Sequence, residues 1–363
     1  MFPVLVVFMP ECGWTRRLPE QSPSRRDGAT RKEKEFMSTR LTITRLAVFV
    51  GLSASLAGCG QLAAQKAFKD GVTAYQTQDY RGAIKSLEEA VQQEFEFRPY
   101  AYFYLANAHD NAYRSTRVGD AENDRHLPEA EKYYRMAFDT IDPASREGQG
   151  ALFKQRALEF LVGLYGPGKL NDPAKAEAVG RQIVELDPKN VNNYFGLAKL
   201  YEDAGRIEEA EEMLLKAREV SPSTVDPYLQ LAGFYNRQGE FEKTMEAFES
   251  RIKIEPNNPE AYHTVAGYFE EKVRKDYTLS TAVKADYIRR GLEAEDKALA
   301  IKADYVDALV MKNLLLRQQA LVERSPAKQK ALLDEATKLR QLAIDIRDKL
   351  QGVTDEAAAK KAS

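Results

Sequence analysis

A 34-residue period is the feature of this sequence that most restricts how it can fold. Between residues 188 and 269, columns of one residue class recur at that spacing. The columns are Pro188, Pro222 and Pro256; Tyr194, Tyr228 and Tyr262; Leu197, Leu231 and Val265; Ala198, Ala232 and Ala266; Tyr201, Tyr235 and Phe269; and Gly205 with Gly239. Because six independent columns keep the same step, we interpret the segment as consecutive copies of one structural unit.

Two helices account for the apolar positions of each unit. The first helix carries them at i, i+3, i+4 and i+7, the pattern of one helical face. One unit shows both sets, with Tyr194, Leu197, Ala198 and Tyr201 in the first helix and Ala210, Leu214 and Ala217 in the second. Gly205 allows the chain to turn between the two helices, and Pro222 ends the unit because it cannot continue a helix.

These columns and this 34-residue helix-turn-helix unit resemble the tetratricopeptide repeat. The resemblance implies an all-α fold, an α-solenoid in which about seven helix pairs stack into a right-handed superhelix. With weaker matches, and with long insertions at residues 111–126 and 272–285, the same register extends over residues 64–350. One pair cannot bury its apolar face alone, so we expect its stability to come from stacking on neighbours.

The segment before the repeats has the features of an export signal. A short basic stretch from Met37 is followed by an apolar run over residues 46–58, which is too short to cross a bilayer. The run ends in LAGC at residues 56–59, which resembles the lipobox of bacterial lipoproteins. The resemblance implies cleavage before Cys59 and acylation of Cys59. An ordinary cleavable signal peptide, or a short anchor, is the alternative.

The chain therefore divides into five parts. We expect a misassigned or disordered leader over residues 1–36, a signal peptide over 37–58, a lipidated linker over 59–63, the solenoid over 64–350 and a disordered tail over 351–363. Translation from Met37 would explain the leader, and a genuine extra leader is the alternative. Gly60 follows the cysteine instead of aspartate. By resemblance to Gram-negative sorting, this favours the outer membrane, with the protein facing the periplasm.

No pattern in the sequence supports catalysis or a bound cofactor. Residues 163–170 read GLYGPGKL, but Leu170 stands where a phosphate-binding loop needs Ser or Thr, and a helical pattern precedes it. His109, His126 and His263 are separated by whole helices, so we predict no metal site. The net charge of −2 gives no electrostatic basis for binding nucleic acid. We predict that the protein is not an enzyme.

The candidate binding site is the face of the first helices, which lines the concave groove in tetratricopeptide families. Mapping that face onto three units gives Tyr100, Phe103, Tyr104 and Asn107; Asn192, Phe195, Lys199 and Glu202; and Gln230, Asn236 and Arg237. Aromatic residues edged by Arg and Asn are typical of protein interfaces. The alternative is that Phe103, Tyr104 and Phe195 pack between neighbouring first helices. Phe195 and Lys199 do not reproduce the carboxylate clamp of chaperone-binding family members.

These features together predict a membrane-anchored scaffold of the bacterial cell envelope. We expect it to bind other envelope proteins or peptides through the groove, and the membrane through acyl chains on Cys59. Its place would be an assembly or export complex, such as outer-membrane protein insertion, pilus biogenesis or polysaccharide export. The alternative is an accessory or binding subunit of a polysaccharide or peptidoglycan enzyme system.

Overall fold

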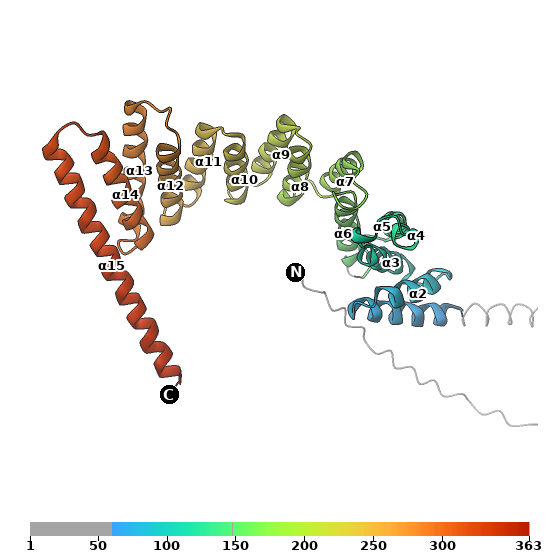
Figure 1. The fold of residues 1–363 in the computed structure, drawn as a ribbon. Coiled ribbons are helices and arrows are strands. Elements are labelled where there is room, and N and C mark those ends of the chain that lie inside the picture. Colours follow the sequence, from blue (N-terminus) through green and yellow to red (C-terminus); the bar gives the residue numbers. More distant parts are fainter. Residues whose placement is uncertain (1–59, 147, 363) are drawn as a thin grey trace, which may run out of the picture. The chain divides into compact units, whose positions relative to one another are not determined.

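The computed structural model describes residues 60–146 and 148–362, and side chains up to residue 351 (Figure 1). The predicted leader, the signal peptide and Cys59 lie outside the described residues. Within those residues the chain is helical and has no strand, which confirms the all-α prediction. It forms two compact units, one ending at Leu186 and one beginning at Asp187.

Unit 1 contains three of the predicted helix pairs. A helix over residues 60–76 is followed by α2 (Tyr80–Val91), α3 (Arg98–Ala112), the 3₁₀ turn η1 (Ser115–Arg117), α4 (Ala121–Asp124), α5 (His126–Thr140), α6 (Gln149–Leu164) and α7 (Pro173–Leu186). The first helix packs against α2 so closely that a Cβ on Gly71 would come within 2.6 Å of Leu87 Cγ. α3 packs against α5, and α6 against α7. The predicted insertion at residues 111–126 forms η1 and α4.

Unit 2 contains four more pairs. Its helices are α8 (Val191–Asp203), α9 (Ile207–Val220), α10 (Asp226–Gln238), α11 (Phe241–Ile254), α12 (Pro259–Lys275), α13 (Thr281–Ile301), α14 (Val306–Val322) and α15 (Pro326–Ala362). Consecutive helices pack in pairs, from α8 with α9 to α14 with α15 (Figure 1). α12 and α13 have 17 and 21 residues against 13 and 14 in α8 and α9, so longer helices absorb much of the insertion at 272–285.

The tyrosine and proline columns are coupled by one repeated hydrogen bond. The Tyr194 hydroxyl donates to the Pro188 carbonyl oxygen at 2.9 Å. The equivalent bonds from Tyr228 to Pro222 and from Tyr262 to Pro256 are both 3.0 Å. Each bond ties the start of a first helix to the loop before it, so the two columns mark a single structural feature.

The helical backbone extends beyond the bounds that the sequence predicted for the solenoid at both ends. The predicted linker at residues 59–63 is helical from residue 60, because the first helix begins there. α15 continues to Ala362, whereas the sequence predicted a disordered tail from residue 351. Residues 351–363 contain four Ala and two Lys, which are among the strongest helix formers, and this favours a helical backbone.

Candidate protein-binding surface

Three of the four predicted binding residues on α3 are buried in unit 1. Tyr100, Phe103 and Asn107 are 4%, 8% and 4% exposed. The Phe103 ring lies edge-on to Phe153 with their centroids 5.0 Å apart, and the Asn107 side-chain amide donates to the Phe103 carbonyl oxygen at 2.8 Å. Their placement on an open groove is therefore wrong, because α6 packs against α3 and covers this face.

Tyr104 is the one half-buried member of this group. Its ring lies 6.1 Å from Phe68 and 5.9 Å from Tyr75, both on the helix over residues 60–76. Burial raises the pKa of the Tyr104 hydroxyl. The alternative weighed from the sequence, packing between neighbouring first helices, therefore describes Phe103 and Tyr104.

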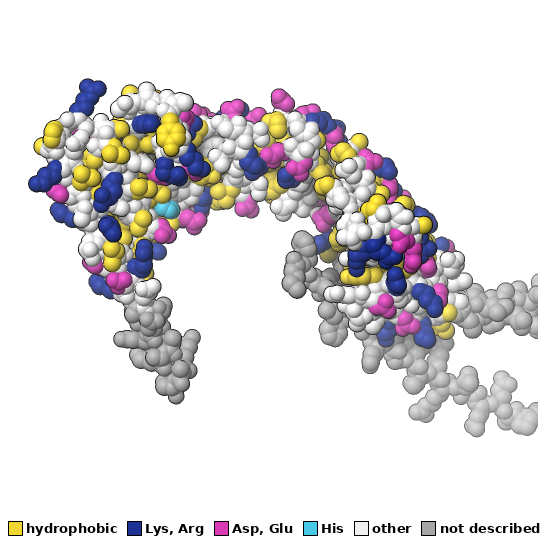
Figure 2. Space-filling view, in the orientation of Figure 1, with side chains coloured by type: hydrophobic (Ala, Val, Ile, Leu, Met, Phe, Trp, Pro, Cys, Tyr) yellow, Lys and Arg dark blue, Asp and Glu magenta, His cyan; other side chains and the backbone are white. Residues whose placement is uncertain are grey.

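The predicted residues of unit 2 are accessible. Asn192 and Lys199 on α8 are exposed and Phe195 is half-buried, while Gln230, Asn236 and Arg237 on α10 are all exposed. Lys199 forms an ion pair with Asp203 on its own helix. Figure 2 shows side chains of both charge signs intermixed over this part of unit 2. The surface can therefore offer hydrogen bonds and charges to a partner without a rearrangement of the core.

An ion pair joins the faces of α8 and α10. Arg237 Nε donates to Glu202 Oε1 at 2.7 Å, and Arg237 Nη2 donates to Glu202 Oε2 at 2.9 Å. This two-point geometry fixes the plane of the guanidinium. The hydrogen bonds from Arg237 lower the pKa of Glu202, and Glu202 in turn raises the pKa of Arg237. Arg237 is thus held in place at the surface.

A shallow pocket of about 310 Å³ lies beside the end of α10. It is lined by Asn236, Phe241, Tyr268, Glu271, Lys272, Lys275 and Asp276. Lys272 lies 5.4 Å from the Phe241 ring centroid and 3.0 Å from Asp276 Oδ2, so the wall holds aromatic and charged groups in contact. Of these residues, only Asn236 was predicted. The one available signal for Tyr268 was its position immediately before the buried Phe269 of the repeat column.

Each of the three histidines contacts another titratable side chain. Among the residues that the structure describes, no group of three His, Cys, Asp or Glu side chains could hold a metal ion. The sequence separation of the histidines was misleading, because His109 and His126 meet with their Nδ1 atoms 3.0 Å apart. His263 Nδ1 lies 2.8 Å from Oε1 of the fully buried Glu295.

The segment that resembles a phosphate-binding loop has a different role. Gly163 lies inside α6 and Lys169 in the turn after it, so no strand precedes the glycines as such a loop requires. Lys169 Nζ forms an ion pair with Asp110 Oδ1 at 2.5 Å, which connects this turn to α3. The segment is the turn of the third repeat.

The described helices contain no candidate for a membrane span, since none combines the required length with sufficient apolar character. The predicted anchor, Cys59, lies outside the described residues.

Comparisons with known proteins identify the repeat. Residues 169–231 match the family model described as "Tetratricopeptide repeat", which confirms the repeat type over that segment. No curated protein matched the chain.

Similar solved structures include other repeat proteins. The C-terminal part of a TPR repeat-containing protein from Cytophaga hutchinsonii is 15% identical, with a TM-score of 0.44 over 77% of this chain and 98% of that one. A tetratricopeptide repeat protein from Parabacteroides merdae is 15% identical, with a TM-score of 0.39 over 76% and 99%. YrrB, described as a TPR protein with an unusual peptide-binding site, is 15% identical, with a TM-score of 0.32 over 55% and 92%.

Proposed function

We propose that this chain is a lipid-anchored scaffold of the bacterial cell envelope that binds other proteins or peptides through the exposed faces of α8 and α10. Tetratricopeptide repeats generally mediate protein–protein interactions, and extended surfaces of stacked helices suit that role. The observation that carries the proposal is the difference between α3 and the helices α8 and α10. The candidate residues on α8 and α10 remain accessible, whereas most of those on α3 are buried.

The chemistry of this surface suits a peptide or a protein segment. The side-chain amides of Asn192, Gln230 and Asn236 can each donate and accept, as the backbone of a bound segment requires. Arg237 is oriented by Glu202, and orientation before binding reduces the entropy that binding costs. Partly exposed aromatic groups and arginine are the residue types that most often anchor interfaces.

Site-specific photo-crosslinking tests this surface. A photoreactive phenylalanine analogue at Gln230 or Asn236 should give a discrete crosslinked partner in envelope preparations, because both side chains are exposed on α10. The same analogue at Glu212, exposed on α9 and paired with Lys216 at 2.6 Å, is the matched control. Arg237→Ala should weaken the crosslink from Asn236 by roughly tenfold or more if Arg237 is an anchor. An identical crosslinking pattern from all three positions would contradict the proposal.

The membrane anchor is tested separately. Since LAGC at residues 56–59 follows a basic and apolar leader, we expect the mature chain to begin at an acylated Cys59, and stable anchoring takes at least two acyl chains. Mass spectrometry of the N-terminal peptide measures both features. The only tryptophan, Trp14, would be lost with the leader, so membrane-purified protein should show tyrosine fluorescence alone. An unmodified Cys59, or tryptophan emission, would refute the anchor.

A further inference from the structure

A polar pocket of about 280 Å³ lies in unit 1, between the turns of the first and second repeats. Its lining comes from the turn before α2, the start of α2, the inserted turn at residues 112–123 and the start of α5: Gln78, Asp79, Tyr80, Arg81, Ala112, Arg114, Arg117, Glu122, Asn123 and His126. The volume corresponds to roughly nine water molecules. The pocket thus exists because the second repeat departs from the standard length.

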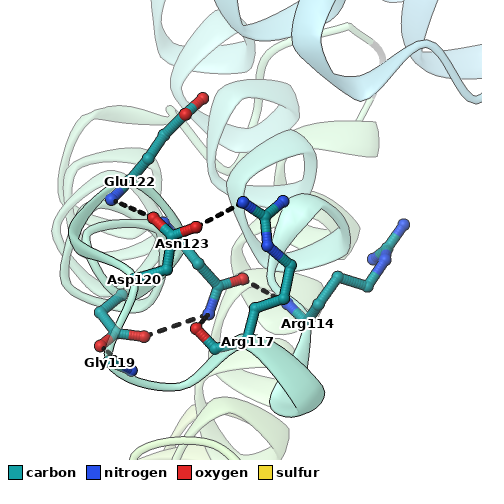
Figure 3. A network of polar contacts seen from close by, with 7 residues as sticks. Arg114, Arg117, Gly119, Asp120, Glu122 and Asn123 are labelled. Atoms are coloured by element: carbon teal, nitrogen blue, oxygen red, sulfur yellow. Dashed lines mark hydrogen bonds and ion pairs between the residues drawn. The ribbon is translucent and has the colours of Figure 1, made fainter.

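The inserted turn that forms one wall is held by its own polar contacts (Figure 3). Asn123 Oδ1 accepts from the Arg114 backbone N–H at 2.8 Å, and Asn123 Nδ2 donates to the Arg117 carbonyl oxygen at 3.2 Å. Arg117 forms an ion pair with Asp120, which also caps α4. Figure 3 shows the Arg114 side chain pointing away from this network. These contacts hold the wall of the pocket in one conformation without a ligand.

Two arginines at this pocket have no carboxylate partner among the described residues. Arg114 donates from Nη1 only to the carbonyl oxygens of Asn111 and Tyr113, and Arg81 is exposed with no ion pair. The nearby Asp79 carboxylate is engaged as the N-cap of α2, where it accepts from Gly82 N–H at 3.0 Å. Figure 2 shows Lys and Arg side chains beside Asp and Glu side chains on the visible face of unit 1. The lining holds three arginines, Arg81, Arg114 and Arg117, against two carboxylates, Asp79 and Glu122, so cations outnumber anions in the pocket wall.

His126 adds a buried polar side chain to the same pocket. It is 7% exposed, and its Nδ1 contacts His109 Nδ1, whereas its Nε2 has no hydrogen bond to the described protein. Behind it, His109 Nε2 is buried without a hydrogen-bond partner and lies 4.0 Å from Glu88 Oε1 on α2. His109 Nε2 is thus left unsatisfied in the folded interior, which calls for an explanation, whereas His126 lines the pocket and can meet a ligand there.

We propose that this pocket binds a phosphate group through Arg81, Arg114 and His126, and that His126 takes up a proton when the phosphate binds. Arginine guanidinium groups match the geometry of phosphate oxygens. A protonated His126 would donate from Nε2 to the phosphate and from Nδ1 to His109 Nδ1. His109 Nε2–H would then face the Glu88 carboxylate, so every ring nitrogen would have an acceptor or donor to face.

The charges around His126 explain why its ring takes up a proton only when phosphate binds. Burial first, and then Arg125, Arg81 and Arg114, lower the pKa of His126, and Glu122 opposes them. Burial and the neighbouring charges of His126, Arg125 and Lys132 likewise lower the pKa of His109. A bound phosphate offsets the field of these arginines and thereby favours the protonated ring.

Calorimetric titration of the full-length protein with inorganic phosphate tests the proposal. Arg81→Gln and Arg114→Gln should each weaken binding by roughly tenfold or more, the usual effect of losing a charged hydrogen bond. Arg156→Gln on α6 makes the same charge change on an exposed residue outside the pocket and should leave binding unchanged. Absence of saturable binding, or equal weakening by all three variants, would overturn the proposal.

Sulfate isolates the protonation step, because its charge is constant between pH 5.5 and 7.5. Wild-type affinity for sulfate should rise as the pH falls over this range, by up to about tenfold per unit, while His126→Gln should show no such rise. A flat wild-type profile would refute proton uptake.

Glycerol 3-phosphate then identifies the source of the phosphate group. If it binds more tightly than inorganic phosphate, a lipid headgroup is the natural ligand, and the reverse order assigns the free ion.

Discussion

Phe103→Ala is expected to lower the free energy of unfolding of unit 1 by about 3–5 kcal/mol, the usual cost of removing a buried aromatic ring. The Phe103 ring is buried, with centroids 5.0 Å from Phe153, 5.9 Å from Phe160 and 6.3 Å from Tyr134. Edge-to-face pairs of this kind stabilise beyond the area they bury. Hydrogen exchange of the backbone amides of α3 and α6 measures the loss within unit 1.

Phe195→Ala on α8 is the matched control, because the sequence assigned both phenylalanines to one binding face. Phe195 is only half-buried, so the same truncation should cost about 1 kcal/mol, measured by exchange of the α8 and α9 amides. Equal losses from the two variants would mean that Phe195 is also a core residue. An unchanged exchange rate in Phe103→Ala would mean that the α3 face is open after all.

Much of the fold could be predicted from the repeat columns, because each column reports a local contact. The apolar face of a first helix, the turn glycine and the terminating proline all lie within one 34-residue unit. The sequence therefore shows the same pattern several times. The same periodicity explains the ion pair between Glu202 and Arg237, which are 35 residues apart. Residues one period apart, or nearly so, occupy equivalent places on adjacent first helices and can touch.

The candidate site could be predicted only where a unit follows the repeat closely. α8 and α10 keep the standard length, and most of their predicted surface residues are exposed, whereas Phe195 is half-buried. In unit 1 the burial of Phe103 depends on its contacts with Phe153 and Phe160, which lie about 50 residues further along the chain. An insertion that has no counterpart in the repeat separates them in sequence. The contact between His109 and His126 arises in the same way. Such packing between non-equivalent positions leaves no periodic signal.

The two histidine sites are expected to give the units opposite responses to pH. Burial lowers the pKa of His109 from its ordinary 6.5 to about 3, so the unfolded chain binds the proton more readily than the folded one. The stability from neutral His109 is complete above pH 6.5 and is lost as the pH falls. At pH 4, unit 1 should have lost about 3 kcal/mol, and the lowered pKa of His126 acts in the same direction.

Unit 2 should weaken as the pH rises. The hydrogen bond that His263 donates to Glu295 raises the pKa of His263, so the stability from this pair is complete below pH 6.5 and is lost as the pH rises through the folded pKa. Burial raises the pKa of Glu295 as well, which also favours the proton-bound form of the pair in the folded state. Both groups therefore stabilise the folded unit 2 on the acid side.

Hydrogen exchange from pH 4 to 8.5, corrected for intrinsic rates and measured without phosphate, separates the two effects. Amides of α3 and α5 should lose protection toward acid, and amides of α12 and α13 toward base. His109→Phe removes the titrating group and keeps the buried space filled, so it should reduce the acid loss in unit 1 and leave unit 2 unchanged. The loss of protection toward acid in unit 1 and toward base in unit 2 can differ only if each histidine affects the stability of its own unit alone. Parallel loss of protection in both units at either extreme of pH would therefore contradict the assignment.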